Sequence, residues 1–407
     1  MRLRTFEALG FREFRLLWFG QLGSAMTLWM DQTTRGWLMY DLTGSMLQLG
    51  LITTVQVLPL LLLSPVAGSL TDRYGRKTQL IAAQVLNIPP ALGLGLLVLT
   101  GRVEPWHVYA TGFIAAVVQV FQQPARQALI PESVDPRRLT NAIGLASIAF
   151  NLSRIVGPAV AGGLIAVVGA GGSYVVQALI YAISAVLTAM LRLPNRAPPS
   201  STERVQQPSF FASIVEGWRY IASHATIRTA LIVSTLAQMF GMSFTTLLPV
   251  FARDVLYVGP AGQGFLLTAQ GLGALCSAFL VASLGESAPK GKLMIAGVTM
   301  YGILEVLFGM SNWYPVSVGL MVLLGVCHVS ANALVQTIVQ GHAAPDMRGR
   351  VMGAWQQNQV VLVVGGLLAG GVASVLGAPM TVVIMGAVAS LGAVLIFLTI
   401  PHVRGIR

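Results

Sequence analysis

Four ionisable side chains interrupt long apolar runs in this sequence, and they have the clearest potential for chemistry. They are Asp31, Arg35, Arg154 and Glu305. If the apolar runs cross a membrane, each such side chain costs about 2.5 to 3.5 kcal/mol at the bilayer centre on insertion scales, so a functional role is expected. All four are therefore candidates for proton coupling.

Asp31 and Arg35 are four residues apart, so both lie on one face of a helix and can pair there. One interpretation is a closed structural ion pair, or an Arg35 side chain that extends to the outer interface. The other is that Asp31 takes up and releases a proton, because a dry site favours its neutral form. The sequence leaves both interpretations open.

Glu305 and Arg154 carry the same kind of ambiguity. Glu305 has no opposite charge nearby in the sequence, so it is either a coupling group or a protonated acid between helices or beside lipid. Arg154 can bind an anionic group or neutralise a carboxylate, or its long side chain can extend to the cytoplasmic surface.

The composition predicts that a membrane surrounds these residues. Hydrophobic residues make up 55% of the chain and charged residues 10%, and the mean hydropathy is +0.74. Soluble domains carry about 25% charge. Because hydrocarbon offers the backbone no hydrogen-bond partners, spans must be helices or a closed barrel, and only helices need runs of about 20 apolar residues. The sequence therefore predicts an all-α membrane protein.

Twelve apolar runs are long enough to be spans. They cover residues 14–40, 46–69, 78–100, 106–129, 139–168, 173–191, 227–251, 262–284, 292–311, 315–340, 351–376 and 380–400. With both termini in the cytoplasm, 21 of the 25 Lys and Arg residues fall on the inside, as the positive-inside rule requires. We therefore expect a multi-pass protein of a bacterial inner membrane.

The remaining composition narrows the partners and the chemistry. The net charge of +11 lies where anionic inner-leaflet lipid would meet it, so no nucleic-acid partner is implied. The sequence shows no Walker loop, no paired metal-ligand motif and no nucleophile elbow, which argues against ATP-driven transport and hydrolysis. We expect no enzyme activity, no cofactor and no metal, and we expect a monomer.

The chain divides near residue 200 into two related halves. We predict an N-terminal six-helix bundle over 1–191, a cytoplasmic linker with an amphipathic helix over 192–226, and a C-terminal six-helix bundle over 227–407. An internal repeat supports the division, because five residues recur at one offset, 336 − 127 = 209. They are Gln127, Pro136, Gly144, Gly157 and Gly162, which map onto Gln336, Pro345, Gly353, Gly366 and Gly371.

A charged, glycine-containing loop between the second and third runs is the most specific motif. Its pattern G-x-L-x-D-R-x-G-R-K resembles the loop signature of the major facilitator superfamily of secondary transporters. The resemblance implies that fold and a gate in which Asp72 accepts hydrogen bonds at the start of the eleventh span. The gating residues would be Gly68, Asp72, Arg73, Gly75, Arg76 and Lys77, with Arg348 and Arg350.

A second motif lies in the fifth run. It resembles the antiporter motif of exporter branches of the superfamily, with Ser153 and Ala161 in place of two glycines. Ordinary close helix packing is the alternative interpretation, because small side chains let backbones approach. The motif residues are Gly144, Ser153, Gly157, Pro158, Ala161 and Gly162.

Two phrases, residues 123–132 (QPARQALIPE) and 348–351 (RGRV), resemble the branch that contains the enterobactin exporter and macrolide efflux proteins. The arginine often found in the middle of helix 4 in drug antiporters is missing here, since Arg126 lies at the inner end of that run. The resemblance implies two pseudo-symmetric bundles with a substrate site between them.

Amide side chains in several runs are poor choices for facing lipid and are candidates for lining the substrate path. They are Gln119, Gln122, Gln238, Gln270 and Gln357. The expected function is secondary active transport, as a proton-coupled exporter (antiporter) of amphipathic small molecules such as drugs. A dedicated siderophore or metabolite exporter, an importer and a lipid flippase stay open as alternatives.

Overall fold

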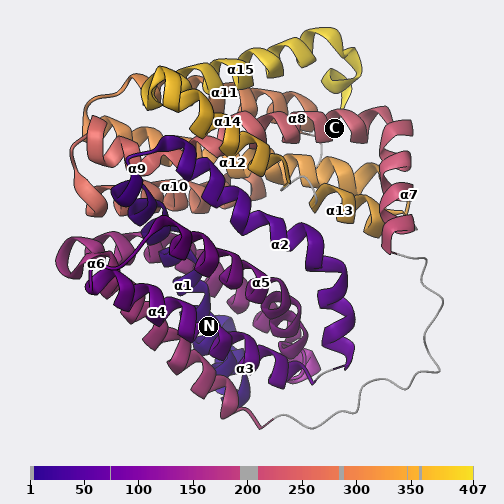
Figure 1. The fold of residues 1–407 in the computed structure, drawn as a ribbon. Coiled ribbons are helices and arrows are strands. Elements are labelled where there is room, and N and C mark those ends of the chain that lie inside the picture. The colour runs from indigo at the N-terminus through magenta and orange to yellow at the C-terminus, as the bar shows by residue number, and fades with distance from the viewer. Residues whose placement is uncertain are drawn as a thin grey trace. The chain divides into compact units, whose positions relative to one another are not determined.

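A computed structural model describes residues 4–73, 75–192, 210–283, 288–345, 347–356 and 360–406. Over these residues every regular element is helical (Figure 1). Eight helices in the described part of the chain are long and apolar enough by themselves to cross a membrane. The protein is therefore an all-helical, multi-pass membrane protein, while the count of twelve spans stays a prediction.

The helices of the first half follow the predicted runs closely. The third predicted run is two helices that meet at Asn87. The fifth and sixth runs form one helical stretch that is interrupted at Gly169, where φ is 72°. The helices are α1 (Arg12–Thr43), α2 (Met46–Arg73), α3 (Arg76–Leu86), α4 (Ile88–Leu99), α5 (Pro105–Leu129) and α6 (Leu139–Ala189).

The second half contains one irregular span. Its first run starts as α8 (Ala225–Leu236) and continues through π-helical turns at Ala237–Gly241 and Phe251–Val255, between which lie a 3-10 turn and the short α9 (Leu248–Val250). The other helices are α7 (Phe210–Ser223), α10 (Gly259–Ala282), α11 (Lys290–Met310), α12 (Tyr314–His342), α13 (Arg348–Gln356), α14 (Val360–Leu376) and α15 (Ala378–Thr399).

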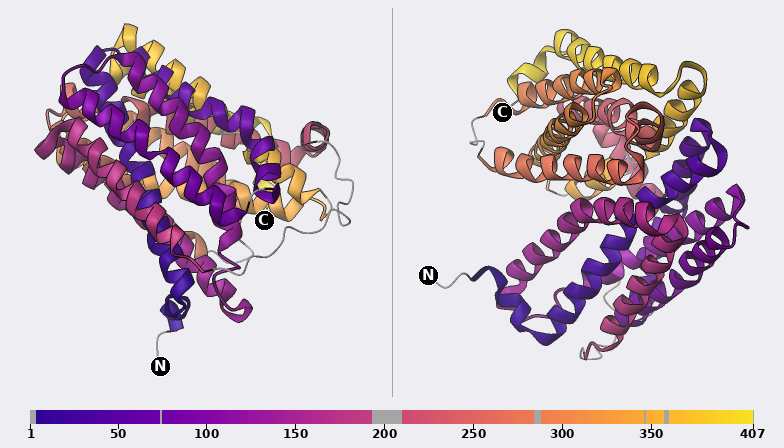
Figure 2. Two further views of the ribbon diagram at one scale, coloured as in Figure 1. Left: turned by 60° about the horizontal axis from the view of Figure 1, so that its bottom comes forward. Right: turned by 90° about the vertical axis from the view of Figure 1, so that its left-hand side faces the viewer.

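The chain forms two compact units, and in each the long helices run side by side (Figure 2). Unit 1 contains Met1–Thr43, Val55–Val205 and Gly259–Thr268. Unit 2 contains Gly44–Thr54, Gln206–Val258 and Ala269–Arg407. Unit 1 thus includes the start of α10, whose remainder belongs to unit 2. Unit 2 includes the start of α2, whose remainder belongs to unit 1.

In unit 1 the helical stretch α6 reverses direction at Gly169, and both of its arms pack against α1. The indole Nε1 of Trp18 donates to the carbonyl of Leu145, at 2.8 Å, in the first arm of α6. On the same part of α1, a Cβ added at Gly20 would lie 3.4 Å from the carbonyl oxygen of Ser184, in the second arm. The two arms are therefore antiparallel to each other and both neighbour α1, and Gly169 supplies the positive φ that the reversal needs.

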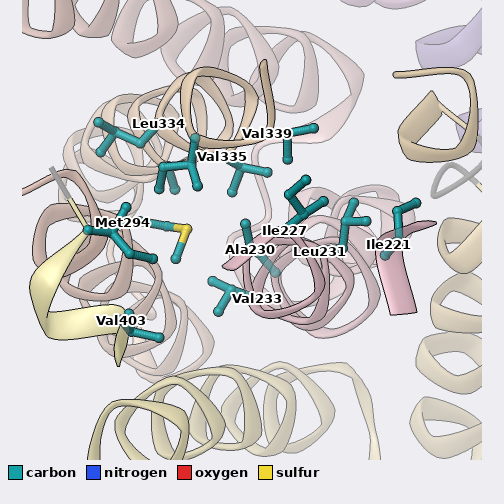
Figure 3. Close-up of a cluster of buried hydrophobic side chains, with 14 of the residues drawn as sticks. Ile221, Ile227, Ala230, Leu231, Val233, Met294, Leu334, Val335, Val339 and Val403 are labelled. Atoms are coloured by element: carbon teal, nitrogen blue, oxygen red, sulfur yellow. The ribbon is translucent and has the colours of Figure 1, made fainter. Parts of the chain in front are cut away.

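Unit 2 is held by an apolar core between α8, α11 and α12 (Figure 3). Ile227 and Leu231 of α8 face Met294 of α11 and Val335 of α12. Burying a side chain of this size contributes about 1.5–3 kcal/mol in water, and between lipid-embedded helices close packing takes over that role. Helices α11 and α15 accordingly meet backbone to backbone, because a Cβ on Gly302 would overlap the carbonyl of Gly386.

Close backbone contacts at glycines fix the start of α10 in unit 1 and the start of α2 in unit 2. In unit 1, a Cβ on Gly264 of α10 would overlap the carbonyl of Pro158 in α6. In unit 2, a Cβ on Gly50 of α2 would lie 2.5 Å from the carbonyl oxygen of Gly366 in α14. Gly50 and Gly264 are equivalent positions of the repeated halves, at the offset 264 − 50 = 214. The same close approach therefore occurs twice.

We expect Gly162→Ala to destabilise unit 1. A Cβ at this position would lie 2.5 Å from the carbonyl oxygen of Pro260, so α10 would have to move away, at a cost of about 1–3 kcal/mol. The adjacent Gly163→Ala is the matched control. Its Cβ meets no atom within 4 Å, so better helix propensity should stabilise that variant by about 0.5–1 kcal/mol. Unfolding midpoints of the two purified variants that move together would contradict this packing.

Candidate functional site

Asp31 and Arg35 form a bidentate ion pair on α1, in unit 1. Arg35 Nη2 donates to Asp31 Oδ1 at 2.7 Å, and Arg35 Nε donates to Asp31 Oδ2 at 3.0 Å. The side chains are 4% and 16% exposed for Arg35 and Asp31 respectively, so water screens the pair little. The i, i+4 spacing therefore produces the pairing that the sequence allowed, with Arg35 directed inward.

Helix α5 supplies the remaining partners of the guanidinium. Arg35 Nη1 donates to the backbone carbonyl of Val108 at 2.6 Å and to the Thr111 hydroxyl at 2.9 Å. Gly112 makes room for this approach, because a Cβ there would lie 3.1 Å from Nη1. One arginine thus ties α1 to α5 through charge-assisted hydrogen bonds.

The second arm of α6 completes the surroundings of the pair. The ring of Tyr174 lies 5.7 Å from Cζ of Arg35, within range of a cation–π contact. Next to it, the hydroxyls of Thr34 and Ser173 are 3.0 Å apart, and Gln177 Nε2 donates to Thr34 at 3.3 Å. The pair therefore lies at a junction of three helices in a polar network.

Glu305 lies in unit 2, on α11, and it is fully buried. Neither of its carboxyl oxygens has a hydrogen-bond partner among the described residues. A Cβ on Gly386 would lie 3.0 Å from Cβ of Glu305, so the acid stands where α15 packs on α11. A bare carboxylate there would cost several kcal/mol, so Glu305 stays a candidate for proton coupling.

Arg76 and Lys77 of the signature loop fasten helix ends inside unit 1. Arg76 pairs with Glu132, just beyond α5, and Lys77 Nζ donates to the carbonyl of Leu191 at 2.6 Å. Gly75 precedes α3 as its N-cap residue. The side chains of three further motif residues lie outside the described part of the chain: Gly68, Asp72 and Arg73. The proposed gate contact of Asp72 therefore stays a prediction.

The two other basic residues of the predicted gate, Arg348 and Arg350, make their contacts inside unit 2. Arg348 Nε donates to the carbonyl of Ala343 at 3.2 Å, and Arg350 pairs with Glu216 of α7. A Cβ on Gly217 would lie 2.8 Å from the carbonyl oxygen of Arg350, so α7 packs directly on α13 (Figure 1). The predicted amphipathic helix thus docks on the helix that begins with Arg348.

Residues of the antiporter-like motif pack α6 against its neighbours in unit 1. Ser153 is buried and donates to the carbonyls of Ala149, at 2.8 Å, and Leu22, at 3.2 Å. Gly157 contacts Trp29 of α1, and Pro158, Ala161 and Gly162 face the start of α10 or are fully buried. Around Gly144 a Cβ would meet no atom within 4 Å. Close packing accounts for most of the motif, while the exporter interpretation stays a prediction.

The predicted path-lining amides are divided between the two units, so their role in a common path stays a prediction. Gln119 is half-buried and Gln122 is buried in unit 1, whereas Gln238 and Gln270 belong to unit 2 and Gln357 lies outside the described residues. In unit 2 a small cavity of about 10 Å³ is lined by Ser234, Tyr301, His328 and Asn332, among others. None of the predicted amides contributes to this lining.

Sequence reasoning missed two features of the site. Val108 and Thr111 hold Arg35 through a carbonyl and a hydroxyl, which leave no distinctive pattern in a sequence. Arg126 lies in the last turn of α5, as expected, but its burial, with the residue only 6% exposed, was not foreseen. A positive charge inside a run of amides, at Gln122 and Gln123, was the one available signal.

A profile of the family described as "Transmembrane secretion effector" matches residues 4–405. Curated relatives include a staphyloferrin A transporter of Staphylococcus aureus, 26% identical over 88% of this chain and 89% of the relative. The multidrug efflux pump Tap of Mycobacterium tuberculosis is 27% identical over 78% of this chain and 76% of the relative. A macrolide efflux protein A of Streptococcus pyogenes is 24% identical over 83% and 84%.

Solved structures confirm the fold at low identity. The nucleoside transporter NupG superposes with a TM-score of 0.72 at 14% identity, over 95% of this chain and 98% of that one. A transporter of the POT family, in complex with 5-aminolevulinic acid, gives 0.74 at 12% identity, over 96% of each chain. The solved structures thus show the fold of membrane transporters, and the matching family and the curated relatives make this chain a transporter rather than an enzyme.

We expect the Asp31–Arg35 pair to be strongly coupled in a double-mutant cycle. Asp31→Asn or Arg35→Gln alone leaves a buried charge without its partner and should lower the free energy of unfolding by about 3–5 kcal/mol. The double variant should cost less than the sum of the two. Chemical unfolding in mixed micelles measures the three values.

The exposed pair Arg350–Glu216 is the control, with side chains 32% and 49% exposed. Its coupling energy should stay below about 1 kcal/mol, because water screens it. An equally small coupling at Asp31–Arg35 would contradict a strongly coupled, buried ion pair on α1.

Proposed function

Because the chain belongs to the transmembrane secretion effector family of the major facilitator superfamily, we propose that it exports amphipathic small molecules in exchange for protons. Its relatives in Mycobacterium and Streptococcus are efflux proteins for several drugs and for macrolides, by their names. Membrane location, transporter fold and family together support export as the task.

The observation that carries the coupling proposal is the buried pair of Asp31 and Arg35. When Asp31 is ionised it accepts two hydrogen bonds from the guanidinium, as in the structure. A proton on this carboxyl would remove its charge, and the contact with Arg35 would weaken to a neutral–cation hydrogen bond. Arg35 would then depend on Val108 and Thr111 of α5, so the tie between α1 and its neighbours would change with each proton.

Orientation follows from the charges and from the source of the relatives. We propose a bacterial inner membrane with both termini in the cytoplasm, since basic residues concentrate in the cytoplasmic loops on that assignment. Protons would then enter along the gradient while substrate leaves.

A dedicated exporter of one metabolite is the second candidate. It is favoured by the staphyloferrin A transporter, whose likeness extends over 88% of this chain. The two candidates differ in substrate range. Export of macrolides and unrelated drugs from one preparation would support the broad function, and export of a single compound would support the narrow one.

We expect Asp31→Asn to abolish uphill export while leaving downhill exchange intact. In proteoliposomes with an imposed pH gradient, the wild-type protein should concentrate a macrolide on the outward side. The variant should only equilibrate it, because the asparagine amide does not take up a proton. Asp41→Asn is the matched control, since Asp41 is an exposed carboxylate at the end of the same helix. Concentration of the macrolide by Asp31→Asn protein would rule this residue out as the proton carrier.

A further inference from the structure

Arg126 is a buried cation in unit 1, and no carboxylate pairs with it in the described part of the chain. Its guanidinium donates to Gln123 Oε1 and lies 5.9 Å from the ring centre of Phe150, and the residue is 6% exposed. A buried charge without a partner strongly destabilises the folded protein. A bound anion that is not part of the protein would supply the missing partner of Arg126.

A second arginine lies on the same face of α6 as this ring. Phe150, Arg154 and Gly157 are spaced i, i+4 and i+7, so they share that face. Arg154 is half-buried, and among the described residues it makes no hydrogen bond or ion pair. Arg126 of α5 thus lies over Phe150, and Arg154 is one helical turn from Phe150 on α6.

Trp29 of α1 adds a neutral donor at the same place. Its ring lies 6.0 Å from that of Phe150, and its Cβ is 2.8 Å from where a Cβ of Gly157 would be. Trp29 thus contacts α6 on both sides of the Arg154 position. Its indole Nε1 is buried and has no hydrogen-bond partner in the described part of the chain.

Four carboxylates of unit 1 are engaged in ion pairs in the described part of the chain: Glu7 with Arg138, Glu13 with Arg12, Asp31 with Arg35 and Glu132 with Arg76. Arg126 of α5 and Trp29 of α1 lie beside the Phe150 ring, and Arg154 is one helical turn from it on α6. Over the residues that the structure describes, these three donor groups lack a charged acceptor.

We propose that Arg126, Arg154 and Trp29 form a subsite that binds the anionic group of an organic acid, with Phe150 against its apolar body. Planar guanidinium groups match carboxylate and phosphate oxygens in a bidentate manner, and the indole N–H supplies a further donor. This inference rests on the proposed export function and adds one substrate class to it, amphiphiles that carry an anionic group. An anionic lipid headgroup has the same chemistry, so the test separates the two sources.

Isothermal titration of purified protein in a neutral detergent tests the charge preference. The matched probes are 2-naphthoate and 2-naphthylmethylammonium, which share one ring system and differ in the sign of charge. We expect the anion to bind at least about tenfold more tightly than the cation, since charge-assisted bonds form only with the anion. Equal affinities, or a preference for the cation, would overturn the subsite.

Single substitutions locate the binding. Arg126→Gln, Arg154→Gln and Trp29→Phe should each weaken naphthoate binding by about tenfold. Arg102→Gln is the control, because Arg102 is exposed in the loop before α5. If Arg126→Gln protein is not monodisperse, the half-buried positions Arg154 and Trp29 decide the outcome. Unchanged affinity in both of those variants would overturn the proposal.

Nanodiscs distinguish a lipid from a soluble acid. If phosphatidylglycerol is the occupant, replacing phosphatidylcholine by it should raise the Kd for naphthoate, and it should do so less in Arg154→Gln. If a soluble acid is the occupant, the Kd should be the same in both lipids. Naphthoate binding without export in proteoliposomes would contradict the exporter function alone, whereas export that ignores charge would contradict the subsite alone.

Discussion

Burial of the Asp31–Arg35 ion pair is the constraint on which the N-terminal part of the structure depends. Two charges in a dry interior are tolerated only when the geometry is good and the remaining donors find acceptors. The bidentate contact on α1 satisfies the first condition, and Val108 and Thr111 of α5 satisfy the second. Helix α1 must therefore keep its position relative to α5 for as long as both charges persist.

The other buried ionisable groups have no oppositely charged partner within the described structure. Arg126 and Arg154 in unit 1 have no acidic partner among the described residues, and Glu305 in unit 2 has none of the opposite sign there. A charge that the protein itself does not neutralise is available to a proton or to a ligand. One compensated pair and several uncompensated groups are what an exchanger of protons and small molecules requires.

Much of this architecture was predictable because hydrocarbon restricts the backbone so strongly. Apolar runs located the helices, and the i, i+4 spacing of Asp31 and Arg35 predicted their pairing. The breaks in the helices differ in this respect. Pro89 and Pro90 follow Asn87 and are a local signal for a new helix start there, whereas the π-helical turns at Ala237–Gly241 and Phe251–Val255 have no such signal. The glycines at the helix contacts were visible as small residues, but the sequence did not show which helix each one meets.

The site was predictable only where residues close in sequence make it. The partners of Arg35 on α5 and the contacts of Arg126 and Trp29 with Phe150 depend on helices far apart in the chain. Periodicity within one helix carries no information on such contacts. The position of Arg126 at the end of α5 was therefore predictable, whereas its burial was not.

The central claim is that Asp31 carries the exchanged proton, and proton movement driven by a substrate gradient tests it most directly. In proteoliposomes that contain a pH-sensitive dye, a macrolide gradient is imposed with no initial pH difference. The account predicts that the macrolide gradient drives protons across the membrane with the wild-type protein and with Glu305→Gln, but not with Asp31→Asn. Proton movement in Asp31→Asn that equals that of the wild type would contradict it.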